Sequence, residues 1–298
     1  MRPSVLAFLA ACGRIAFDPL ANGDAAEPPP PWAGNFTMSP PALVSELMSA
    51  DSEVECYVVP DGSQLYFARY GSTSHDIWTA ARTSVDAPWA NITSLSSING
   101  ATSDEGRIAT VDELRGYFWS DRAATASSSD ILMVKRATPS DPWLSANAKL
   151  VSGLDTTLDE YDPWPSADGS RIYFAFDGVS GNLLDIYVAD VLGDWSASTP
   201  QLLGGLATVY IEDNPSLGED ELFLVFSSER GGSKDLFYAR RTDRSLPFDP
   251  PTLLPVINDP TTNETEGCIT RQGELFFSSD RPAGGGSYDI YRSVFIPL

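Results

Sequence analysis

Short runs of apolar and polar residues alternate along most of the chain, and no stretch shows the 3.6-residue apolar period of an amphipathic helix. A clear example is the pair of runs at residues 221–226 and 235–239. Tight turns separate the runs, as at Asp61-Gly62 and Asp168-Gly169, where glycine accepts the positive φ angle of two-residue hairpin turns. The pattern predicts antiparallel strands and almost no helix.

Two independent markers recur at intervals of about 50 to 57 residues, which indicates an internal repeat. The first is an aspartate followed by Ile or Leu, and the second is an aromatic residue near a turn. The aspartates are Asp76, Asp130, Asp185, Asp235 and Asp289, and the aromatic residues are Trp32, Trp89, Trp143, Trp195 and Phe248. Each interval contains four candidate strands. Repeated units of four antiparallel strands are typical of the blades of a β-propeller.

The two ends of the repeat region predict how the ring closes. A strand-like segment, residues 42–47, precedes the first unit, and the last unit contains only three candidate strands. Pairing of residues 42–47 with residues 289–296 supplies the fourth strand and removes both open edges. We therefore predict an all-β fold in which residues 36–298 form a five-bladed propeller, closed by an N-terminal strand that pairs in the last blade.

Two pairs of segments carry a family resemblance. Residues 159–163 with 166–174, and residues 278–281 with 288–291, resemble the WD40-like repeats of TolB-type propellers of the bacterial periplasm. The resemblance implies a propeller in the cell envelope, often non-catalytic, that contacts other proteins. TolB itself has six such blades and a further domain, whereas five units are found here.

The N-terminus is typical of an export signal. Residues 1–11 combine one positive charge with a short apolar segment, and a membrane-spanning helix needs about 20 apolar residues. Residues 9–12, Leu-Ala-Ala-Cys, resemble a bacterial lipobox, which implies cleavage before Cys12 and lipid attachment to its thiol. Residues 12–35 are small, acidic and proline-rich, as expected of a flexible tether. We predict a lipoprotein on the periplasmic face of the outer membrane or at the cell surface.

The charge of the chain bears on its partners. With 41 acidic and 19 basic residues the formal net charge is −22, which argues against nucleic acid as a partner. His75 is the sole histidine, so a histidine-rich metal centre is excluded. The acidity permits Ca²⁺ without requiring it, and no other cofactor is expected. We expect a monomer whose contact with the membrane is the lipid anchor alone.

Two sets of carboxylates repeat from unit to unit. One set opens the first strand of each unit and the other opens the third, so both are expected on one rim of the ring. They are Glu53, Glu105, Glu160, Glu212 and Glu264, and Asp76, Asp130, Asp185, Asp235 and Asp289. Catalysis needs an acid and a base in different environments, whereas these residues recur without division of labour. Their repetition favours a structural role as loop caps.

Other candidate residues lie where the units differ. Tyr57 and Trp164 are expected to line the central channel, where they either contact a ligand or fill a narrow bore. Cys56 and Cys268 fall in the first strands of the first and last units, which become neighbours when the ring closes. They form either a disulfide that clamps the closure or two separate buried thiols.

These observations favour a non-enzymatic envelope lipoprotein whose propeller binds a protein or a glycan, with no catalytic residue assigned. The alternative is a carbohydrate-active enzyme similar to a glycosidase. That alternative requires two or three unrepeated carboxylates in the central pocket, at separations of about 5 to 9.5 Å. Asp162 and Glu55 lie outside the repeated motif and are the candidates for such a role.

Overall fold

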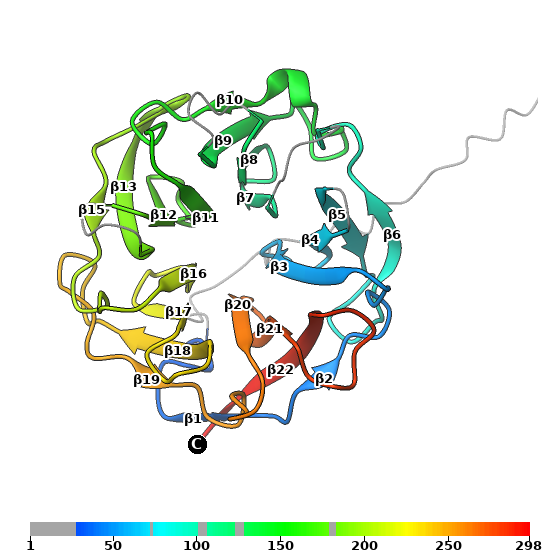
Figure 1. The fold of residues 1–298 in the computed structure, drawn as a ribbon, viewed down its shortest axis with the longest axis vertical. Coiled ribbons are helices and arrows are strands. Elements are labelled where there is room, and N and C mark those ends of the chain that lie inside the picture. The colour runs from blue at the N-terminus through cyan, green and yellow to red at the C-terminus, as the bar shows by residue number, and fades with distance from the viewer. Residues whose placement is uncertain (1–27, 72–73, 101–105, 123–127, 179–182) are drawn as a thin grey trace, which may run out of the picture.

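The computed structural model describes residues 28–71, 74–100, 106–122, 128–178 and 183–298, which form five antiparallel sheets around a central axis (Figure 1). We number the sheets as blades 1 to 5 in chain order. Blade 1 comprises β3 (Ser52–Val58), β4 (Gln64–Tyr70), β5 (His75–Ala81) and β6 (Ala90–Ser94); blade 2 comprises β7 (Ala109–Val111), β8 (Arg115–Ser120), β9 (Asp130–Lys135) and β10 (Lys149–Leu150). The five-bladed fold of four-stranded antiparallel sheets is confirmed.

The remaining blades follow the same order from the axis outward. Blade 3 comprises β11 (Glu160–Pro165), β12 (Arg171–Phe176), β13 (Asp185–Gly193) and β15 (Gln201–Leu202), and β14 (Ser196–Ala197) also pairs with β13. Blade 4 comprises β16 (Glu212–Leu217), β17 (Phe223–Ser228), β18 (Asp235–Arg240) and β19 (Thr252–Leu253). Blade 5 comprises β20 (Glu264–Ile269), β21 (Glu274–Ser279) and β22 (Asp289–Pro297), and both β2 (Ala42–Leu43) and β1 (Phe36–Met38) pair with β22. One short 3₁₀-helix, Ser145–Asn147, is the only helix among the described residues, and the described part of the chain contains no helix with the length and apolar character of a transmembrane segment.

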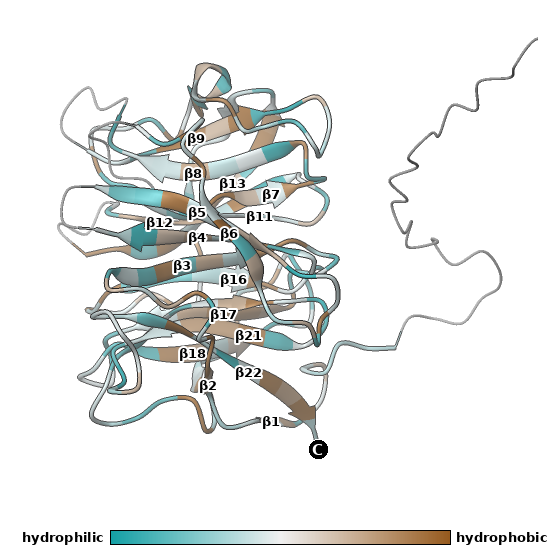
Figure 2. Cartoon of the chain, turned by 90° about the vertical axis from the view of Figure 1, so that its right-hand side faces the viewer, coloured by the Kyte–Doolittle hydropathy of each residue, from teal (hydrophilic) through white to brown (hydrophobic). Residues whose placement is uncertain are grey.

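The ring closes through an N-terminal strand, as predicted, but this strand is split in two. In β2, Ala42 pairs with Arg292, and in β1, Phe36 pairs with Pro297 at the end of β22. Figure 2 shows β1 beside the C-terminal end of β22. The residues between β1 and β2 include Pro40 and Pro41, which have no N–H group to donate to a ladder. The split therefore follows from the sequence, and residues 45–47 form a turn and not a strand.

Packing of the N-terminal segment begins before β1. The ring of Trp32 stacks on Phe223 with centroids 5.5 Å apart and meets Phe295 edge-on at 5.2 Å. Trp32 is buried, so the end of the expected tether is held against blades 4 and 5. This contact extends the closure of the ring beyond the paired strands.

The aromatic marker of the repeat has a packing role that involves an arginine. Trp89, Trp143 and Phe248 are buried, and each lies under a guanidinium group at 4.4, 4.1 and 4.5 Å from the ring centroid. The three arginines follow the third strand of blades 1, 2 and 4, and the Nε atom of each donates to a carbonyl in the turn between the first two strands. They are Arg82 to Gly62, Arg136 to Glu113 and Arg241 to Glu221. The arginine and the aromatic ring thus connect the loop that follows the third strand to the turn between the first two strands of the same blade.

Candidate functional site

The first strand of a blade lies next to the axis, and in four blades it contains a β-bulge. The register shifts between Val54 and Tyr57 in β3, and equivalent shifts occur in β11, β16 and β20. A bulge leaves one residue unpaired and turns its side chain in a new direction. The bulged residues are Glu55, Asp162, Asn214 and Glu266, with φ angles of 53°, 55°, 53° and 58°. Non-glycine residues in this left-handed region are uncommon and concentrate at functional sites.

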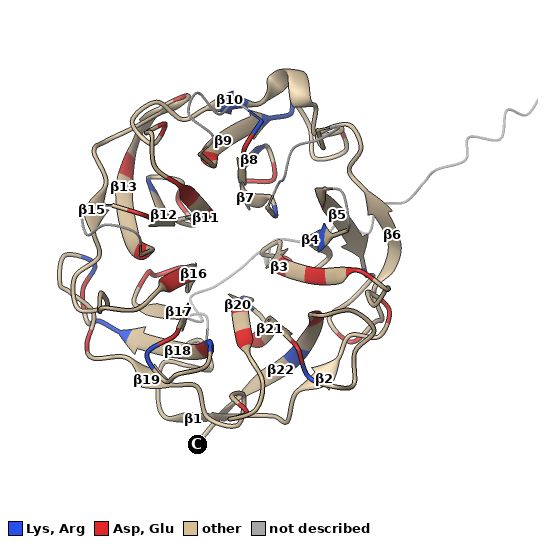
Figure 3. Ribbon diagram, viewed as in Figure 1, with Lys and Arg blue, Asp and Glu red and all other residues tan. Residues whose placement is uncertain are grey.

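Blade 2 supplies a fifth residue at the same place. Each bulged residue stands two positions after the repeated glutamate that opens its strand, and in blade 2 that position is Arg107. We call Glu55, Arg107, Asp162, Asn214 and Glu266 the axial residues. Figure 3 shows acidic residues on β11, β16 and β20 near the centre of the ring. The repeat thus brings five inequivalent side chains to one place.

Glu55 is the most heavily hydrogen-bonded axial residue. The hydroxyl of Tyr70 donates to its Oε1 at 2.5 Å, and the indole Nε1 of Trp119 donates to its Oε2 at 3.0 Å. The backbone N–H of Arg107 also donates to Oε2, at 3.2 Å. Glu55 is therefore held in a fixed orientation by three donors.

Arg107 lies between two of the carboxylates. Its Nη1 is 3.9 Å from Oε2 of Glu55 and 3.8 Å from Oδ1 of Asp162. The two oxygens are thus less than about 8 Å apart, below the upper limit of about 9.5 Å for the two carboxyl groups of glycoside hydrolases. Burial acts to lower the pKa of Arg107, but Asp162 and Glu55 outweigh it and raise the pKa.

Neighbouring blades also connect through the bulges. Oε2 of Glu266 accepts the backbone N–H of Glu55 at 2.9 Å, and Oδ2 of Asp162 accepts that of Asn214 at 3.3 Å. The side chain of one axial residue thus satisfies the strained backbone of the next blade. This arrangement holds the carboxylates in place before any ligand arrives.

The axial carboxyl groups have unlike environments. Burial, followed by the charge of Glu55, raises the pKa of Glu266 to about 7. Burial and then Glu55 also raise the pKa of Asp162 well above its ordinary value, although Arg107 opposes the shift. A proton is therefore available at the axis near neutral pH, next to the hydrogen-bonded carboxyl group of Glu55.

Several buried polar atoms near the axis have no hydrogen-bond partner among the described residues. They are Nε and Nη1 of Arg107, Oδ1 of Asp213 and Oδ1 of Asn214. These three residues are at most 5% exposed. Buried polar atoms are nearly always paired with protein or ordered water, so a concentration of unpaired ones indicates a place for a polar ligand or for water.

The glutamates predicted as rim caps accept hydrogen bonds from the preceding loop. Glu53 accepts from the backbone and hydroxyl of Ser49 and pairs with Arg69 at 2.8 Å. Glu212 pairs with Arg230 at 3.1 Å, and Glu264 pairs with Arg281 at 3.3 Å. Glu105 lies outside the described residues. Among the aspartates, Asp130, Asp185, Asp235 and Asp289 are buried where the third strands begin, and Asp76 is half-buried.

Glu160 is the exception among the described rim glutamates. It faces Phe176 across the ladder, where Glu212 faces Ser228, and Gly178 stands where blade 4 has Arg230. Its hydrogen bond comes from Thr156 at 2.5 Å, and its Oε2 has no partner among the described residues. Burial raises the pKa of Glu160 to about 8. Blade 3 therefore carries a buried carboxyl group that is protonated at neutral pH.

We expect Glu160→Gln to stabilise the protein at pH 9 by roughly 1 to 3 kcal/mol, because it removes a buried charge. The folded pKa, about 8, lies above the ordinary 4.5, so the proton's contribution to stability is complete below pH 4.5 and is lost as the pH rises to about 8. Urea unfolding at pH 5 and pH 9 measures the difference. Glu212→Gln is the control and should destabilise at both pH values, because it removes the ion pair with Arg230. Equal destabilisation by both variants at pH 9 would contradict this account.

Tyr57 and Trp164 lie together in the core of the ring. Their rings meet edge-on with centroids 5.1 Å apart, both are buried, and the Tyr57 hydroxyl donates to the carbonyl of Thr110 at 2.8 Å. The structure thus places them in contact with each other, and a ligand contact stays a prediction. His75 stacks on Tyr70 with centroids 3.6 Å apart, so it supports the residue that hydrogen-bonds Glu55.

Cys56 and Cys268 lie close together as free, buried thiols. The Sγ of Cys56 donates to the carbonyl of Glu266 at 3.7 Å, and the Sγ of Cys268 accepts from the N–H of Val58 at 3.4 Å. Burial, together with the Cys268 thiol, raises the pKa of Cys56 well above its ordinary value, which makes it a poor nucleophile. The disulfide stays a prediction. Cys12 and the signal segment lie outside the described residues.

The metal prediction also stays open. No group of three or more His, Cys, Asp or Glu residues in the described ranges is arranged to hold a metal ion. Arg107 occupies the space between Glu55 and Asp162 that a cation shared by these carboxylates would need. Binding of Ca²⁺ therefore stays a prediction for other parts of the rim.

No protein-family model and no curated protein matches the sequence. Solved structures match in fold: a thermostable family-43 glycoside hydrolase has a TM-score of 0.58 and 14% identity, covering 85% of this chain and 92% of that one. A TolB-type structure from Agrobacterium tumefaciens has a TM-score of 0.50 and 12% identity, covering 89% of this chain and all of the other. The chain spans just under half of TolB from Acinetobacter baumannii (46%), with 16% identity over 68% of this chain and a TM-score of 0.43.

Most of the similar structures are enzymes that act on glycans. An endo-1,4-beta-xylanase from Bacteroides thetaiotaomicron matches with a TM-score of 0.56 and 14% identity, covering 84% of this chain and 92% of the other. Further arabinofuranosidase, xylosidase and arabinase structures match with TM-scores from 0.53 to 0.56. At these identities the likeness extends to the fold alone. It confirms a propeller of the kind seen in TolB-type proteins.

The prediction of a non-enzymatic scaffold is wrong by this comparison, which favours the alternative reading. Repetition of the rim carboxylates favoured a structural role for them. The axial positions two residues further along carry Glu, Arg, Asp, Asn and Glu, and they include Glu55 and Asp162, the two candidates for the alternative reading.

Proposed function

We propose that the protein is a carbohydrate-active enzyme that hydrolyses glycosidic bonds with the axial carboxylates. The observation that carries the proposal is the convergence of Glu55 and Asp162 on Arg107, with Glu266 bonded to the backbone of Glu55. Glycoside hydrolysis uses a pair of carboxyl groups, one that donates a proton and one that acts as nucleophile or as base for water. The fold comparisons support the same reaction class.

The environments assign a role to each group. Glu266 is the general acid, because its raised pKa, about 7, keeps a proton on it near neutral pH. Glu55 is the nucleophile or the base for water, because three hydrogen bonds from Tyr70, Trp119 and Arg107 fix the orientation of its carboxyl group. Asp162 fixes Arg107 and the bulge of Asn214.

The unpaired buried atoms define what the site recognises. Nε of Arg107 is a donor, and Oδ1 of Asp213 and Oδ1 of Asn214 are acceptors, so together they suit the hydroxyl groups of a sugar. Glu55, Asp162, Asp213 and Glu266 outnumber Arg107 and Lys234, whose Nζ pairs with Asp213 at 2.6 Å. Lys234 is paired with Asp213, and Arg107 lies between Glu55 and Asp162, so neither cation is left for the carboxylate of an anionic sugar, and the proposed substrate is a neutral glycan. Lipid attachment at Cys12 is the proposed anchor that places the enzyme in the cell envelope.

A screen of neutral polysaccharides and aryl glycosides for release of reducing ends or of the aryl group tests this proposal. We expect turnover on at least one neutral glycoside, with a rate that falls as the pH rises through about 7, because Glu266 then loses its proton. Glu266→Asp should change the pH at which the rate falls, because the shorter side chain places the carboxyl group differently in the buried site. Absence of turnover across the panel, in protein shown to be folded by its melting transition, would refute the proposal.

A further inference from the structure

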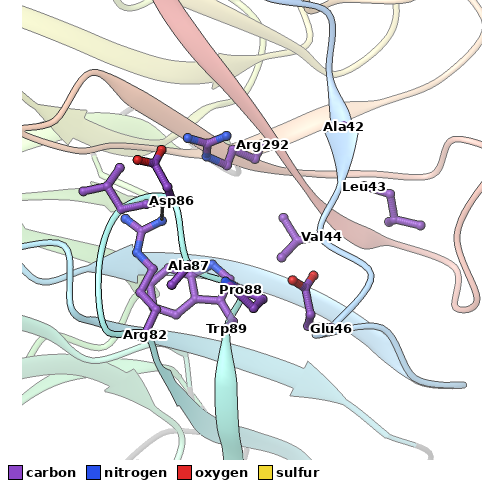
Figure 4. Close-up of a pocket in the computed structure, with 11 residues that line it drawn as sticks. Ala42, Leu43, Val44, Glu46, Arg82, Asp86, Ala87, Pro88, Trp89 and Arg292 are labelled. Carbon is purple, nitrogen blue, oxygen red and sulfur yellow. Dashed lines mark hydrogen bonds between the residues drawn. The ribbon is translucent and has the colours of Figure 1, made fainter.

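A cavity of about 350 Å³ lies at the seam where the ring closes, away from the axial residues (Figure 4). Its walls come from the segment that includes β2, from the loop between β5 and β6, and from β22. Leu43, Val44, Val85 and Pro88 make up much of its apolar lining. The volume is at the lower end of the range of about 300 to 1,000 Å³ for small-molecule sites. It suits a small molecule and is too small for a polymer.

The two arginines that line this cavity, Arg82 and Arg292, share one buried glutamate, Glu274. Both oxygens of Glu274 bind Arg82, at 3.0 and 2.5 Å, and its Oε1 also binds Nε of Arg292 at 2.6 Å. Arg82 is further fixed by the carbonyls of Gly62 and Val85 and lies 4.4 Å above the ring of Trp89. Two guanidinium groups thus share a single carboxylate, which leaves one positive charge in a protein whose net charge is −22.

Arg292 is positioned to bind a ligand carboxylate. Glu274 holds its Nε, its side chain is 36% exposed, and its two terminal nitrogens make no hydrogen bond to the described residues. A guanidinium group held in this way presents two parallel donors, the geometry that recognises a carboxylate. Arg82 cannot serve, because its nitrogens are engaged and it is almost fully buried.

Acidic residues stand on the other sides of the cavity. Glu46 and Asp86 line it and are exposed. In Figure 4, Val44 lies between Glu46 and Arg292. A purely anionic ligand would meet these carboxylates, whereas a ligand with an ammonium group is attracted to Glu46. The apolar residues between the two charges suit a hydrocarbon side chain.

We propose that this seam cavity binds a small zwitterion, an α-amino acid or dipeptide, with its carboxylate on Arg292 and its ammonium group on Glu46. The apolar side chain of the ligand packs on Val44 and Pro88. The site joins β2 to blade 1, so an occupied cavity links the closing strand to the neighbouring blade and stabilises the closed ring by mass action. This inference is independent of the proposed enzyme activity.

Calorimetric titration and melting-temperature shifts with the twenty amino acids, tested singly, and with Leu-Leu test the site. We expect at least one apolar zwitterion to bind and raise the melting temperature. Its N-acetyl and C-amide forms should each bind at least about tenfold more weakly, because each loses one charged contact. Arg292→Gln should weaken binding by a similar factor and leave the fold intact, because Arg82 still pairs with Glu274.

Two variants separate binding from folding. Ala87→Trp fills the cavity without altering a charge and should abolish binding, whereas Arg271→Gln changes an exposed arginine near Glu219 and should bind as the unaltered protein does. The proposal fails if no probe binds, if Ala87→Trp binds normally, or if the capped ligands bind as well as the free zwitterion.

Discussion

Replacing Glu266 with glutamine should reduce kcat for glycoside cleavage by about 100- to 10,000-fold, the usual contribution of a general acid. The amide keeps the shape of the side chain, and its oxygen retains the bond to the N–H of Glu55, but it has no acidic proton to give to the leaving group. KM should change little, because the hydroxyl-binding atoms of Arg107 and Asn214 remain. Steady-state kinetics on an aryl glycoside with a poor leaving group measure the loss.

Glu219→Gln is the matched control for this variant. Glu219 is an exposed glutamate in the turn between β16 and β17, so the same substitution there should leave kcat unchanged. Substrates with a good leaving group, which need less help from an acid, should lose less activity in Glu266→Gln. An unchanged kcat in Glu266→Gln on both kinds of substrate would remove Glu266 from the mechanism.

Arg107→Met should destabilise the protein by about 3 to 5 kcal/mol at pH 8, because it leaves Glu55 and Asp162 buried without their shared cation. The pKa of Asp162 is already raised above its ordinary 3.8, and removal of Arg107, which opposes the shift, should raise it further. A carboxyl group whose pKa is raised in the folded state contributes stability to the protein. This contribution is complete at pH values below its ordinary pKa and is lost as the pH rises through its folded pKa. The destabilisation should therefore shrink at pH 5, as measured by urea unfolding at the two pH values.

Arg115→Met serves as the control for the loss of an ion pair. Arg115 pairs with Asp112 at 3.1 Å on the surface, and both side chains are partly exposed. Exposed pairs contribute about 0 to 1 kcal/mol, so this variant should have a small effect that does not depend on pH between 5 and 8. If Arg107→Met changed the free energy of unfolding only slightly, and equally at both pH values, Arg107 would not be the cation that stabilises Glu55 and Asp162.

The propeller was predictable because its signals are local. Aspartates that open the third strands and aromatic residues in the following loops recur in each unit, and together they fix the number of blades. The glycine turns have the expected positive φ angles, 76° at Gly62 and 68° at Gly169. The split of the closing strand at Pro40 and Pro41 was also within reach of the sequence, because proline interrupts a ladder.

The axial site was predicted only in part, since Glu55 and Asp162 were candidates but Arg107, Asn214 and Glu266 were not. Alignment of the five units on the repeated glutamate places four residue types two positions later, Glu, Arg, Asp and Asn, and this signal was available. The sequence does not reveal the bulges that turn these side chains to the axis, because all four bulged residues are non-glycine residues. The backbones of Glu55 and Asn214 are bonded by a side chain of the preceding blade. Pairing of Arg107 with both Glu55 and Asp162 depends on the geometry of the closed ring, which no local pattern encodes.

The arginines that join loops within a blade were likewise not predicted. Arg82, Arg136 and Arg241 follow the third strand at matching positions, but their partners are backbone carbonyls, which leave no trace in the sequence.

The arginines that pair with the rim glutamates form a separate set. Blade 3 lacks such an arginine beside Glu160, and Gly178 stands at its position, close to the hydroxyl of Tyr187. A repeat motif therefore predicts the contacts that the blades share. It does not show as readily which blade lacks one of these contacts.

The most direct test of the central claim is a crystal structure of the Glu266→Gln variant bound to a neutral oligosaccharide that the unaltered protein cleaves. We expect one glycosidic oxygen to lie within hydrogen-bond distance of residue 266, with the adjacent anomeric carbon facing Glu55 and sugar hydroxyls bonded to Arg107 and Asn214. An oligosaccharide bound only at the outer loops, with the axial residues still closed around Arg107, would contradict the account.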